Sequence, residues 1–419
     1  MVATTLLQNP AYLKIDLYCQ GARLSPDLMV EQAGGRKILR TRAGLGSGLE
    51  LVLPGDLWTN VPVTEDFAKV SPYEIGPSPS GDESDVEIRY DGEAVVTARL
   101  APRPAWYDRK TSSGRPMTQI GTLQGTYLGI YPGKVCEFWS PSAKSNCHFC
   151  SVGLNLGVDD SREKTIRDIL EVAHAAQEES KITYVDFNAG HADDFSYLDM
   201  LEPIVSKVKE ETGLLIGLQA PPHPDLTRYD RLRNAGVNRV SFCFEIFDPQ
   251  RFAEVCPGKA KTYGLRKYLE AVEYCASLGA RGPSGEPWVT NGELIAGLEK
   301  PESTIAAIDW LTERGAVPTV CVFRPLRGTD YVHVPPPTTE QMIPVFRHLF
   351  EACARKNLPI GVAPNVHVSL VMLPEEGRFL SDDWGLKAAW QMKRAPKALA
   401  ARWWLRSRTR RAKAQIAAR

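Results

Sequence analysis

Between Tyr127 and Lys356 the chain alternates short apolar runs with segments of helical periodicity, and this alternation limits the possible folds most. Six runs lead into or lie between the helical segments, and a seventh follows them: Tyr127–Tyr131, Ile182–Asn188, Leu214–Gln219, Arg239–Phe244, Val289–Ala296, Val317–Phe323 and Ile360–Ala363. The helical segments are Ile166–Glu179, Tyr197–Glu211, Leu226–Ala235, Tyr263–Leu278, Ser303–Arg314 and Glu340–Lys356. Repeated βα units predict a parallel sheet with right-handed crossovers. About six units favour an α/β partial (β/α)6 barrel, and a full eight-fold barrel is the second possibility.

Three cysteines stand in the loop between the first strand and the first helix. Cys136, Cys147 and Cys150 have the spacing C-x10-C-x2-C. Structural zinc is usually closed by four ligands, and a four-iron cluster also takes four, one per iron. Three thiolates would therefore leave one iron open for a substrate or cofactor. The alternatives are buried structural cysteines, or a zinc site completed by His148 or a distant histidine.

This loop resembles the cluster loop of the radical S-adenosylmethionine (SAM) enzymes, whose usual pattern is C-x3-C-x2-C with an aromatic residue before the third cysteine. Phe149 holds that aromatic position. The first gap is ten residues instead of three, but closure entropy grows only slowly with loop length. The resemblance implies that Cys136, Cys147 and Cys150 ligate a [4Fe-4S] cluster and that Phe149 lies beside the cofactor.

Two strand ends carry polar residues where the resembling family binds SAM. The family's G-G-E-like motif, which holds the amino group of SAM, is replaced here by the stretch from Asn188 through Gly190 to His191. Glu245 ends the fourth strand, where the family's acidic or polar residue binds the ribose or the methionyl group. The resemblance therefore implies that Asn188, Gly190 and Glu245 contact SAM. The alternatives are a plain polar loop and a helix-capping or salt-bridged glutamate.

The last two strands complete the resemblance. The stretch from Gly292 through Ala296 and Gly297 is similar to the family's G-x-I-x-G-x-x-E segment, whose backbone approaches the adenine, although its glycine is displaced by one. Arg324 and Arg327 follow the sixth strand, and either guanidinium could bind a substrate carboxylate or phosphate; surface salt bridges are the alternative. We predict Glu245 and Arg324 as catalytic residues. The order of segments is most similar to the biotin synthase-like branch.

The resemblance implies reductive cleavage of SAM to a 5′-deoxyadenosyl radical, which takes hydrogen from an organic substrate, with a lipid or membrane-held molecule as one candidate class. Rearrangement or carbon–carbon bond formation is the first expected outcome. Sulfur insertion is the second, and it would need a further cluster from cysteines such as Cys243, Cys256 and Cys321. A flavodoxin or ferredoxin would supply electrons. The alternative from another class is a zinc- or cluster-bearing RNA-binding protein, although we expect no nucleic-acid partner.

The length of the chain and its cysteine content indicate how many domains it can form and which cellular compartment suits it. The 419 residues suffice for two domains. Nine cysteines, an odd number, with no visible secretory signal favour a reducing cytoplasm, and no apolar run reaches 18 residues. Residues 1–120 predict a mainly β accessory domain before a radical SAM barrel at 121–372. Its predicted strands are Lys37–Thr41 and Glu50–Leu53 around a glycine-rich turn, and Asp85–Tyr90 and Ala94–Leu100 around Asp91-Gly92.

Residues 373–419 form a basic tail that we predict to be helical. From Trp384 onward there are 11 Lys and Arg and no Asp or Glu, whereas the other 383 residues carry a net charge of −11. Apolar residues at helical spacing (Ala401, Leu405, Ala412 and Ile416), with Trp403 and Trp404 beside them, predict a helix that contacts an anionic membrane surface. A disordered tail, a helix docked on the acidic body and an RNA contact are the alternatives.

Overall fold

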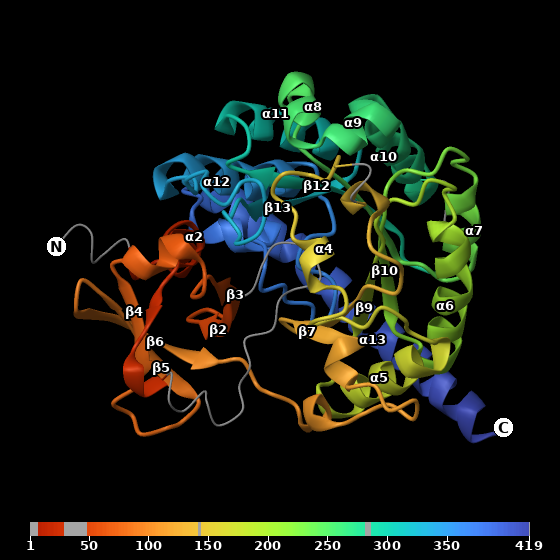
Figure 1. Ribbon diagram of the computed structural model, residues 1–419, viewed down its shortest axis with the longest axis horizontal. Helices are drawn as coiled ribbons and strands as arrows, with labels where there is room; N and C mark the ends of the chain where they lie inside the picture. Colours follow the sequence, from red (N-terminus) through yellow and green to blue (C-terminus); the bar gives the residue numbers. More distant parts are fainter. Residues whose placement is uncertain (1–6, 29–47, 141–143, 281–285, 419) are drawn as a thin grey trace.

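Two β sheets lie side by side in the computed structural model, which describes residues 7–28, 48–140, 144–280 and 286–418 (Figure 1). The larger sheet has seven strands in the order β13-β12-β11-β10-β9-β8-β7. Strands β8 to β13 run parallel, and β7 joins the edge antiparallel to β8. The strands are β7 (Thr122–Gln124), β8 (Tyr127–Ile130), β9 (Tyr184–Asn188), β10 (Leu215–Gln219), β11 (Arg239–Glu245), β12 (Val289–Ala296) and β13 (Val317–Val322).

Helices connect the parallel strands and cover the outer face of the curled sheet (Figure 1). They are α5 (Ile166–Glu179), α6 (Tyr197–Thr212), α7 (Arg228–Asn234), α10 (Gly264–Ala280), α11 (Pro301–Glu313) and α12 (Thr339–Arg355), with the shorter α4 (Val152–Asn155), α8 (Pro249–Val255) and α9 (Pro257–Thr262) in the loops. The predicted six strands and their helices are thus present as a curled, open parallel sheet. The predicted seventh strand, Ile360–Ala363, is wrong: Gly361 has a φ of 63° and the segment forms a turn.

The register of the sheet places rows of side chains at equal heights inside the curl. Asp186 on β9 pairs with Gly217 on β10, which pairs with Arg239 on β11. A Cβ at Gly217 would lie 1.7 Å from the Tyr184 hydroxyl oxygen, so only glycine fits there. Because successive strand residues point to opposite faces, alternate positions of each strand line this interior.

The smaller sheet is built from the N-terminal part of the chain, in the order β1-β4-β5-β6-β2-β3. Its strands are β1 (Arg23–Leu24), β2 (Leu49–Leu53), β3 (Leu57–Val61), β4 (Tyr73–Pro77), β5 (Asp85–Tyr90) and β6 (Glu93–Leu100). Asp91 and Gly92 both have positive φ, at 48° and 84°, as the predicted two-residue hairpin turn requires. The predicted strand Lys37–Thr41 lies outside the described residues.

A helix that the sequence analysis did not predict, α2 (Pro10–Gln20), ties this N-terminal layer to the far end of the chain. Lys14 Nζ lies 2.7 Å from Glu376 Oε2 in the 3-10 helix η5 (Pro374–Phe379), and both side chains are buried. The Tyr18 hydroxyl donates a hydrogen bond of 2.6 Å to the carbonyl of Ser369. These contacts cross both predicted domain boundaries, at 120 and 372, which remain a prediction.

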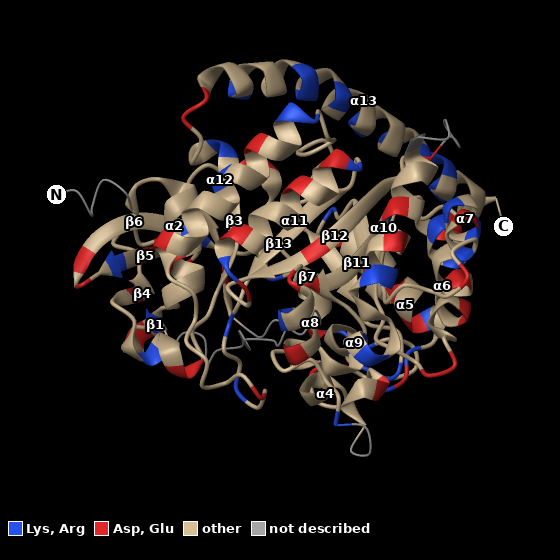
Figure 2. Cartoon of the chain, turned by 90° about the horizontal axis from the view of Figure 1, so that it is seen from above, with Lys and Arg blue, Asp and Glu red and all other residues tan. Residues whose placement is uncertain are grey.

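The basic tail forms one long helix, α13 (Trp384–Ala417), which crosses the barrel side of the molecule along α12 and α6 (Figure 2). Trp390, Leu405 and Ala412 are buried against the body. The Arg408 guanidinium pairs with the Glu286 carboxylate, and Lys209 Nζ lies 5.6 Å from the centroid of the Trp404 ring. Among the described residues, none of the helices is long and apolar enough to cross a membrane.

Our prediction of which face of α13 contacts lipid is therefore wrong for most of its residues. Leu405 and Ala412 pack inward and Ala401 is half-buried, while Ile416 near the end of the helix is exposed. The tail carries apolar residues on two sides, and its periodicity alone does not decide which side meets the body. The acidic body is the partner of the inner side.

Candidate active site

A pocket of about 130 Å³ lies where the parallel strands end and brings the three predicted cysteines together. We call it the cysteine pocket. Asn188, Gln219 and Glu245, the last residues of β9, β10 and β11, line its floor. Its other lining residues come mainly from the cysteine loop, the loop after β9 and the segment from α9 to α10: Tyr131, Cys136, Phe138, Trp139, Asn146, Cys147, Phe149, Cys150, Val152, Ala189, Gly190, His191, Ala220, Pro221, Cys243, Lys259 and Tyr268.

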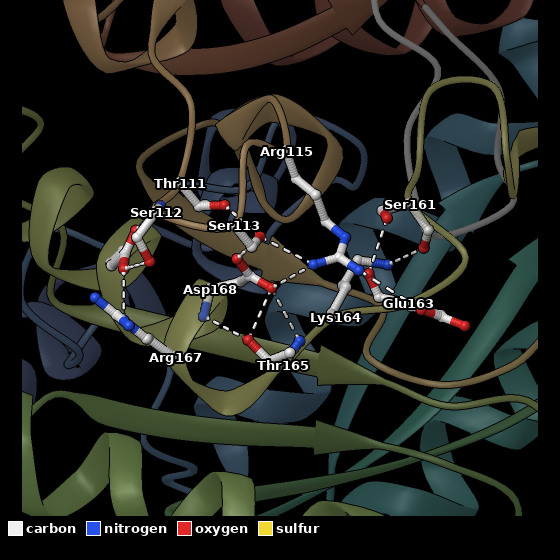
Figure 3. A network of polar contacts seen from close by, with 11 residues as sticks. Thr111, Ser112, Ser113, Arg115, Ser161, Glu163, Lys164, Thr165, Arg167 and Asp168 are labelled. Carbon is white, nitrogen blue, oxygen red and sulfur yellow. Dashed lines mark hydrogen bonds and ion pairs between the residues drawn. The ribbon is translucent and has the colours of Figure 1, made fainter.

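Polar contacts fix both ends of the cysteine loop. Lys164 Nζ, whose side chain is buried, lies 2.7 Å from the Tyr131 carbonyl at the end of β8 and 2.7 Å from Asp160. At the start of α5, Thr165 and Asp168 form a reciprocal capping box. Arg115 contacts Asp168 at 3.1 Å from the other side (Figure 3). The chain therefore leaves the sheet and enters α5 at fixed points, which holds the cysteines over the strand ends.

The three thiols form a donor set suited to an iron–sulfur cluster. The pKa of Cys136 is raised to about 11 and that of Cys150 to about 12, mainly by burial and in part by the nearby Cys147. All three are free thiols. Buried thiolates in mutual repulsion need a compensating cation, and soft thiolates select iron–sulfur clusters or zinc. The residues present thus fit the [4Fe-4S] group that the resemblance implies.

Gly190 supplies the room that the first cysteine needs. A Cβ at this position would lie 2.5 Å from the Cys136 Cβ and 2.6 Å from the Tyr131 hydroxyl oxygen. The Gly190 amide donates a hydrogen bond of 3.0 Å to that hydroxyl. The loop after β9 therefore lies against Cys136, as expected if Asn188 and Gly190 belong to the same site.

Two residues of the site were not selected from the sequence. His191 is buried in the lining, where its Nδ1 lies 2.6 Å from the Tyr263 hydroxyl and its Nε2 lies 2.9 Å from Asp193 Oδ1. Its ring stacks on Phe138 at 4.2 Å. Lys259 enters the pocket from α9. The glycine beside His191 and the Cys-Pro-Gly-Lys stretch that begins α9 were visible in the sequence, but nothing local links them to the cysteine loop.

Glu245 lies in the pocket as predicted and is held by Lys259. Lys259 Nζ lies 3.0 Å from Glu245 Oε1 and donates a hydrogen bond of 2.6 Å to the Cys243 carbonyl. Burial raises the pKa of Glu245 above its ordinary value, and the Lys259 ammonium opposes that shift. Glu245 has a φ of 66°, an uncommon conformation for a side-chain-bearing residue that is often found at functional sites.

Cys256 lies beside the cluster ligands without lining the pocket. Its thiol hydrogen-bonds Cys147 and lowers the pKa of that thiol. The adjacent backbone pairs with the cysteine loop, because the His148 amide donates a 3.0 Å hydrogen bond to the Val255 carbonyl. Of the other cysteines considered for a second cluster, Cys243 lines the cysteine pocket and Cys321 does not. The structure does not bring these three cysteines to one cavity.

Four predicted site residues lie elsewhere. Gly292, Ala296 and Gly297 do not line the cysteine pocket. The Arg324 guanidinium donates to the side-chain and carbonyl oxygens of Asn60 on β3, at 3.0 and 2.7 Å, and lies 4.8 Å from the Tyr18 ring centroid. Arg324 is buried in the junction between the two sheets, because the chain after β13 turns toward the N-terminal sheet. The structure therefore does not support a catalytic role for Arg324.

Residues 140–322 match the sequence profile of the Radical SAM superfamily. The chain is a radical SAM enzyme. This family implies a [4Fe-4S] cluster and SAM as cofactors, in agreement with the thiols of the cysteine pocket. The matched range contains Cys147, Cys150 and the strands β9 to β13, and it begins after Cys136.

One curated relative and several solved structures are similar to this radical SAM enzyme. The bacteriochlorophyllide c C-7(1)-hydroxylase of Chlorobaculum limnaeum is 23% identical over 280 residues, which cover 62% of this chain and 68% of that protein. Methylornithine synthase (PylB) is 17% identical with a TM-score of 0.43, over 58% of this chain and 71% of that one. HydG, a maturase of the [FeFe]-hydrogenase, is 11% identical with a TM-score of 0.40, over 54% and 48%.

Proposed function

We propose that this radical SAM enzyme holds its cluster on Cys136, Cys147 and Cys150 and removes a hydrogen atom from a carbon of a large organic substrate. The meeting of three thiols, of which Cys147 is buried and the other two half-buried, with Glu245 and Lys259 in one pocket carries the proposal. The bound cluster and SAM supply a one-electron cleavage that generates the hydrogen-abstracting species. The three cysteine thiolates would bind the cluster. Asn188, Gly190 and Glu245 would orient SAM, and the walls of the cysteine pocket would exclude water.

The balance of the reaction fixes what must be supplied. One electron and one SAM would be consumed for each hydrogen atom removed, and methionine, 5′-deoxyadenosine and a carbon-centred substrate radical would be formed. The electron comes from a reduced protein of the flavodoxin or ferredoxin class. Rearrangement or carbon–carbon bond formation stays our prediction for the product. The relative's name, a hydroxylase acting on a bacteriochlorophyllide, favours a large ring molecule as a further substrate class.

Alanine substitution of each cysteine tests the cluster assignment. Cys136→Ala, Cys147→Ala and Cys150→Ala should each lower the iron content after anaerobic reconstitution and abolish dithionite-dependent formation of 5′-deoxyadenosine. Cys275→Ala, the same substitution in the buried core of α10, should leave both unchanged. Full iron and activity in Cys136→Ala would show that another residue closes the site after the ten-residue gap.

Sulfur insertion is the second candidate, and the positions of Cys243, Cys256 and Cys321 disfavour it. A second cluster needs several thiols at one cavity, whereas these three are directed to different surroundings. We therefore propose a single cluster. Four iron atoms per chain after reconstitution are expected, and a clear excess bound to protein would favour the second candidate.

We further propose a peripheral contact with an anionic membrane through the outer side of α13. Met392, Leu399 and Trp403 are 71%, 69% and 75% exposed. At about 100° per residue they fall within about 40° of one another around the helix, on the side away from Leu405. Exposed apolar side chains in register on a basic helix are typical of interfacial helices.

Basic residues flank this outer side and set its lipid preference. Arg402, Arg406 and Arg410 are exposed beside it, and α13 contains no carboxylate side chain (Figure 2). Three such residues near an anionic surface contribute about 3 kcal/mol at low salt. Insertion of Leu399 and Trp403 adds up to about 2 kcal/mol each. The contact would be reversible and sensitive to salt.

Vesicle co-sedimentation tests this contact in the full chain. Wild-type protein should pellet with vesicles of phosphatidylcholine and phosphatidylserine at low salt, and not with phosphatidylcholine alone. Leu399→Ser with Trp403→Ser should weaken binding at least tenfold. Val70→Ser with Val158→Ser, at two exposed valines far from α13, is the matched control. Equal pelleting of both variants would refute the assignment of this face.

A further inference from the structure

A second and larger cavity, of about 660 Å³, lies at the opposite end of the parallel strands. We call it the lower cavity. The first residues of strands β9 to β13 line its rim: Tyr184, Leu215, Arg239, Val289 and Val317. Its remaining walls are the segment 359–375, which is mainly apolar, and the inner side of α13 at Ala400, Ala401 and Trp404. This volume lies in the range of cavities that bind drug-sized and larger molecules.

A layer of polar side chains separates the lower cavity from the cysteine pocket. Gln219 lines both spaces and hydrogen-bonds Glu293. Arg239 lies 2.7 Å from Glu293 and 3.2 Å from Asp186, and Ser241 donates a 2.6 Å hydrogen bond to Glu293. The Arg239 guanidinium faces two carboxylates, so the layer has no unmatched positive charge. This disfavours an anionic ligand at this depth, since an added anion would have no counter-charge there.

Asn291 offers the lower cavity a side chain that can bind a polar ligand atom. Its side chain is buried, at 6% exposure, and lines the cavity. Nδ2 donates a hydrogen bond of 2.9 Å to Thr319 Oγ1, while Oδ1 has no partner among the residues that the structure describes. If the amide were turned over, its nitrogen would be left without a partner instead. A buried polar atom is rarely left unpaired in a native protein unless a water or ligand meets it.

We propose that the lower cavity holds the apolar body of the substrate and that Asn291 Oδ1 accepts a hydrogen bond from one of its N–H or O–H groups. The substrate class is a large, mostly apolar molecule that carries no anionic group at this depth and has at least one such donor. This inference rests on the proposed radical function. The substrate enters beneath α13 and extends to Gln219, the side chain that lines both spaces, and its reacting carbon meets SAM in the cysteine pocket past that side chain.

The same helix connects this site with the membrane contact. Ala400, Ala401 and Trp404 wall the lower cavity, whereas Leu399 and Trp403 are exposed on the outer side. An apolar substrate dissolved in lipid would therefore leave the bilayer close to the cavity. The cavity requires only its own walls, so it can be tested without any membrane.

Binding of the apolar dye Nile red to the full chain tests the cavity. Val368 is half-buried and lines the cavity, so the larger indole of Val368→Trp narrows it. We expect Val368→Trp to weaken Nile red binding at least tenfold, and the same substitution at the exposed Val70 to leave it unchanged. Equal dye affinity in Val368→Trp and wild type would overturn the proposal.

Substrate-independent formation of 5′-deoxyadenosine separates the two proposals. Val368→Trp should still cleave SAM slowly with dithionite, because the cysteine pocket is untouched. If wild type cleaves SAM but Val368→Trp binds dye normally, only the cavity is refuted. If wild type binds dye but never cleaves SAM after reconstitution, the radical function fails while the cavity stands.

A pair of matched ligands tests the role of Asn291. In competition with Nile red, 1-decanol offers a hydroxyl donor and 1-methoxydecane does not. Wild type should favour the alcohol over the ether by about 2- to 10-fold, the value of one hydrogen bond. Asn291→Leu, of similar shape, should bind both ligands equally. The same preference in Asn291→Leu and wild type would refute the hydrogen bond while leaving the cavity in place.

Discussion

Replacing Glu245 by glutamine tests whether this carboxylate binds SAM. Lys259 contacts Oε1, and within the described part of the chain Oε2 accepts no hydrogen bond. A ribose hydroxyl is a suitable donor for that oxygen. Losing a charge-assisted hydrogen bond costs about 1.5–3 kcal/mol, so SAM affinity should fall roughly 10- to 150-fold. Isothermal calorimetry on the reconstituted enzyme measures this directly.

The ion pair with Lys259 determines the control for this experiment. Glu245→Gln leaves a buried ammonium without its counter-charge, and breaking a buried pair costs about 3–5 kcal/mol of stability. At about 2.1 cal/mol/K of unfolding entropy per residue, that lowers the Tm of 419 residues by about 3–6 °C. The double variant Glu245→Gln/Lys259→Met should recover much of the Tm but none of the SAM affinity. Unchanged SAM affinity in the folded single variant would remove Glu245 from the cofactor site.

Three further predictions concern the scaffold. Burial raises the pKa of Glu50 to about 7, so its stabilising contribution is full below pH 4.5 and lost as the pH rises to 7; Glu50→Gln should reduce the fall in Tm between pH 5.5 and 8 by an amount equivalent to about 2 kcal/mol. Lys14→Met should cost about 3–5 kcal/mol by leaving Glu376 unpaired, and Lys14→Met/Glu376→Gln should restore most of the Tm lost. Gly190→Ala should lower the iron content at nearly unchanged Tm, because its Cβ displaces Cys136; unaltered iron content would contradict the close approach of the two loops.

The strands and helices of the barrel could be predicted because their periodicity is local. The C-x10-C-x2-C spacing led us to predict that the three cysteines belong to one site, and all three line the cysteine pocket; their role as cluster ligands stays a prediction. Lys259 and His191 reach the same pocket from distant segments of the chain, and no local sequence pattern predicts that they lie together. Arg324 follows a strand end, as predicted, but its direction depends on Asn60 in the other sheet. A strand end therefore locates a residue along the barrel without deciding which way its side chain points.

Helix faces were harder to predict than helices. The tail was predicted as a helix, yet Leu405 faces the body and Leu399 faces outward. Both sides carry apolar residues, so only the packing partner distinguishes them. The Asn9 side chain caps α2 and Pro10 begins it, but the buried Lys14 and Asp16 interrupt the apolar pattern of this helix.

The link between α2 and the 369–379 segment has a consequence for synthesis of the protein. Tyr18 and Ser369 are 351 residues apart, and Lys14 and Glu376 are 362 apart. At about 5–20 residues per second a ribosome needs roughly 20–70 s to make that interval. During this time α2 has emerged but its buried lysine has no carboxylate to meet. The N-terminal layer therefore completes its folding only after the barrel strands have been made and residues 369–379 have emerged.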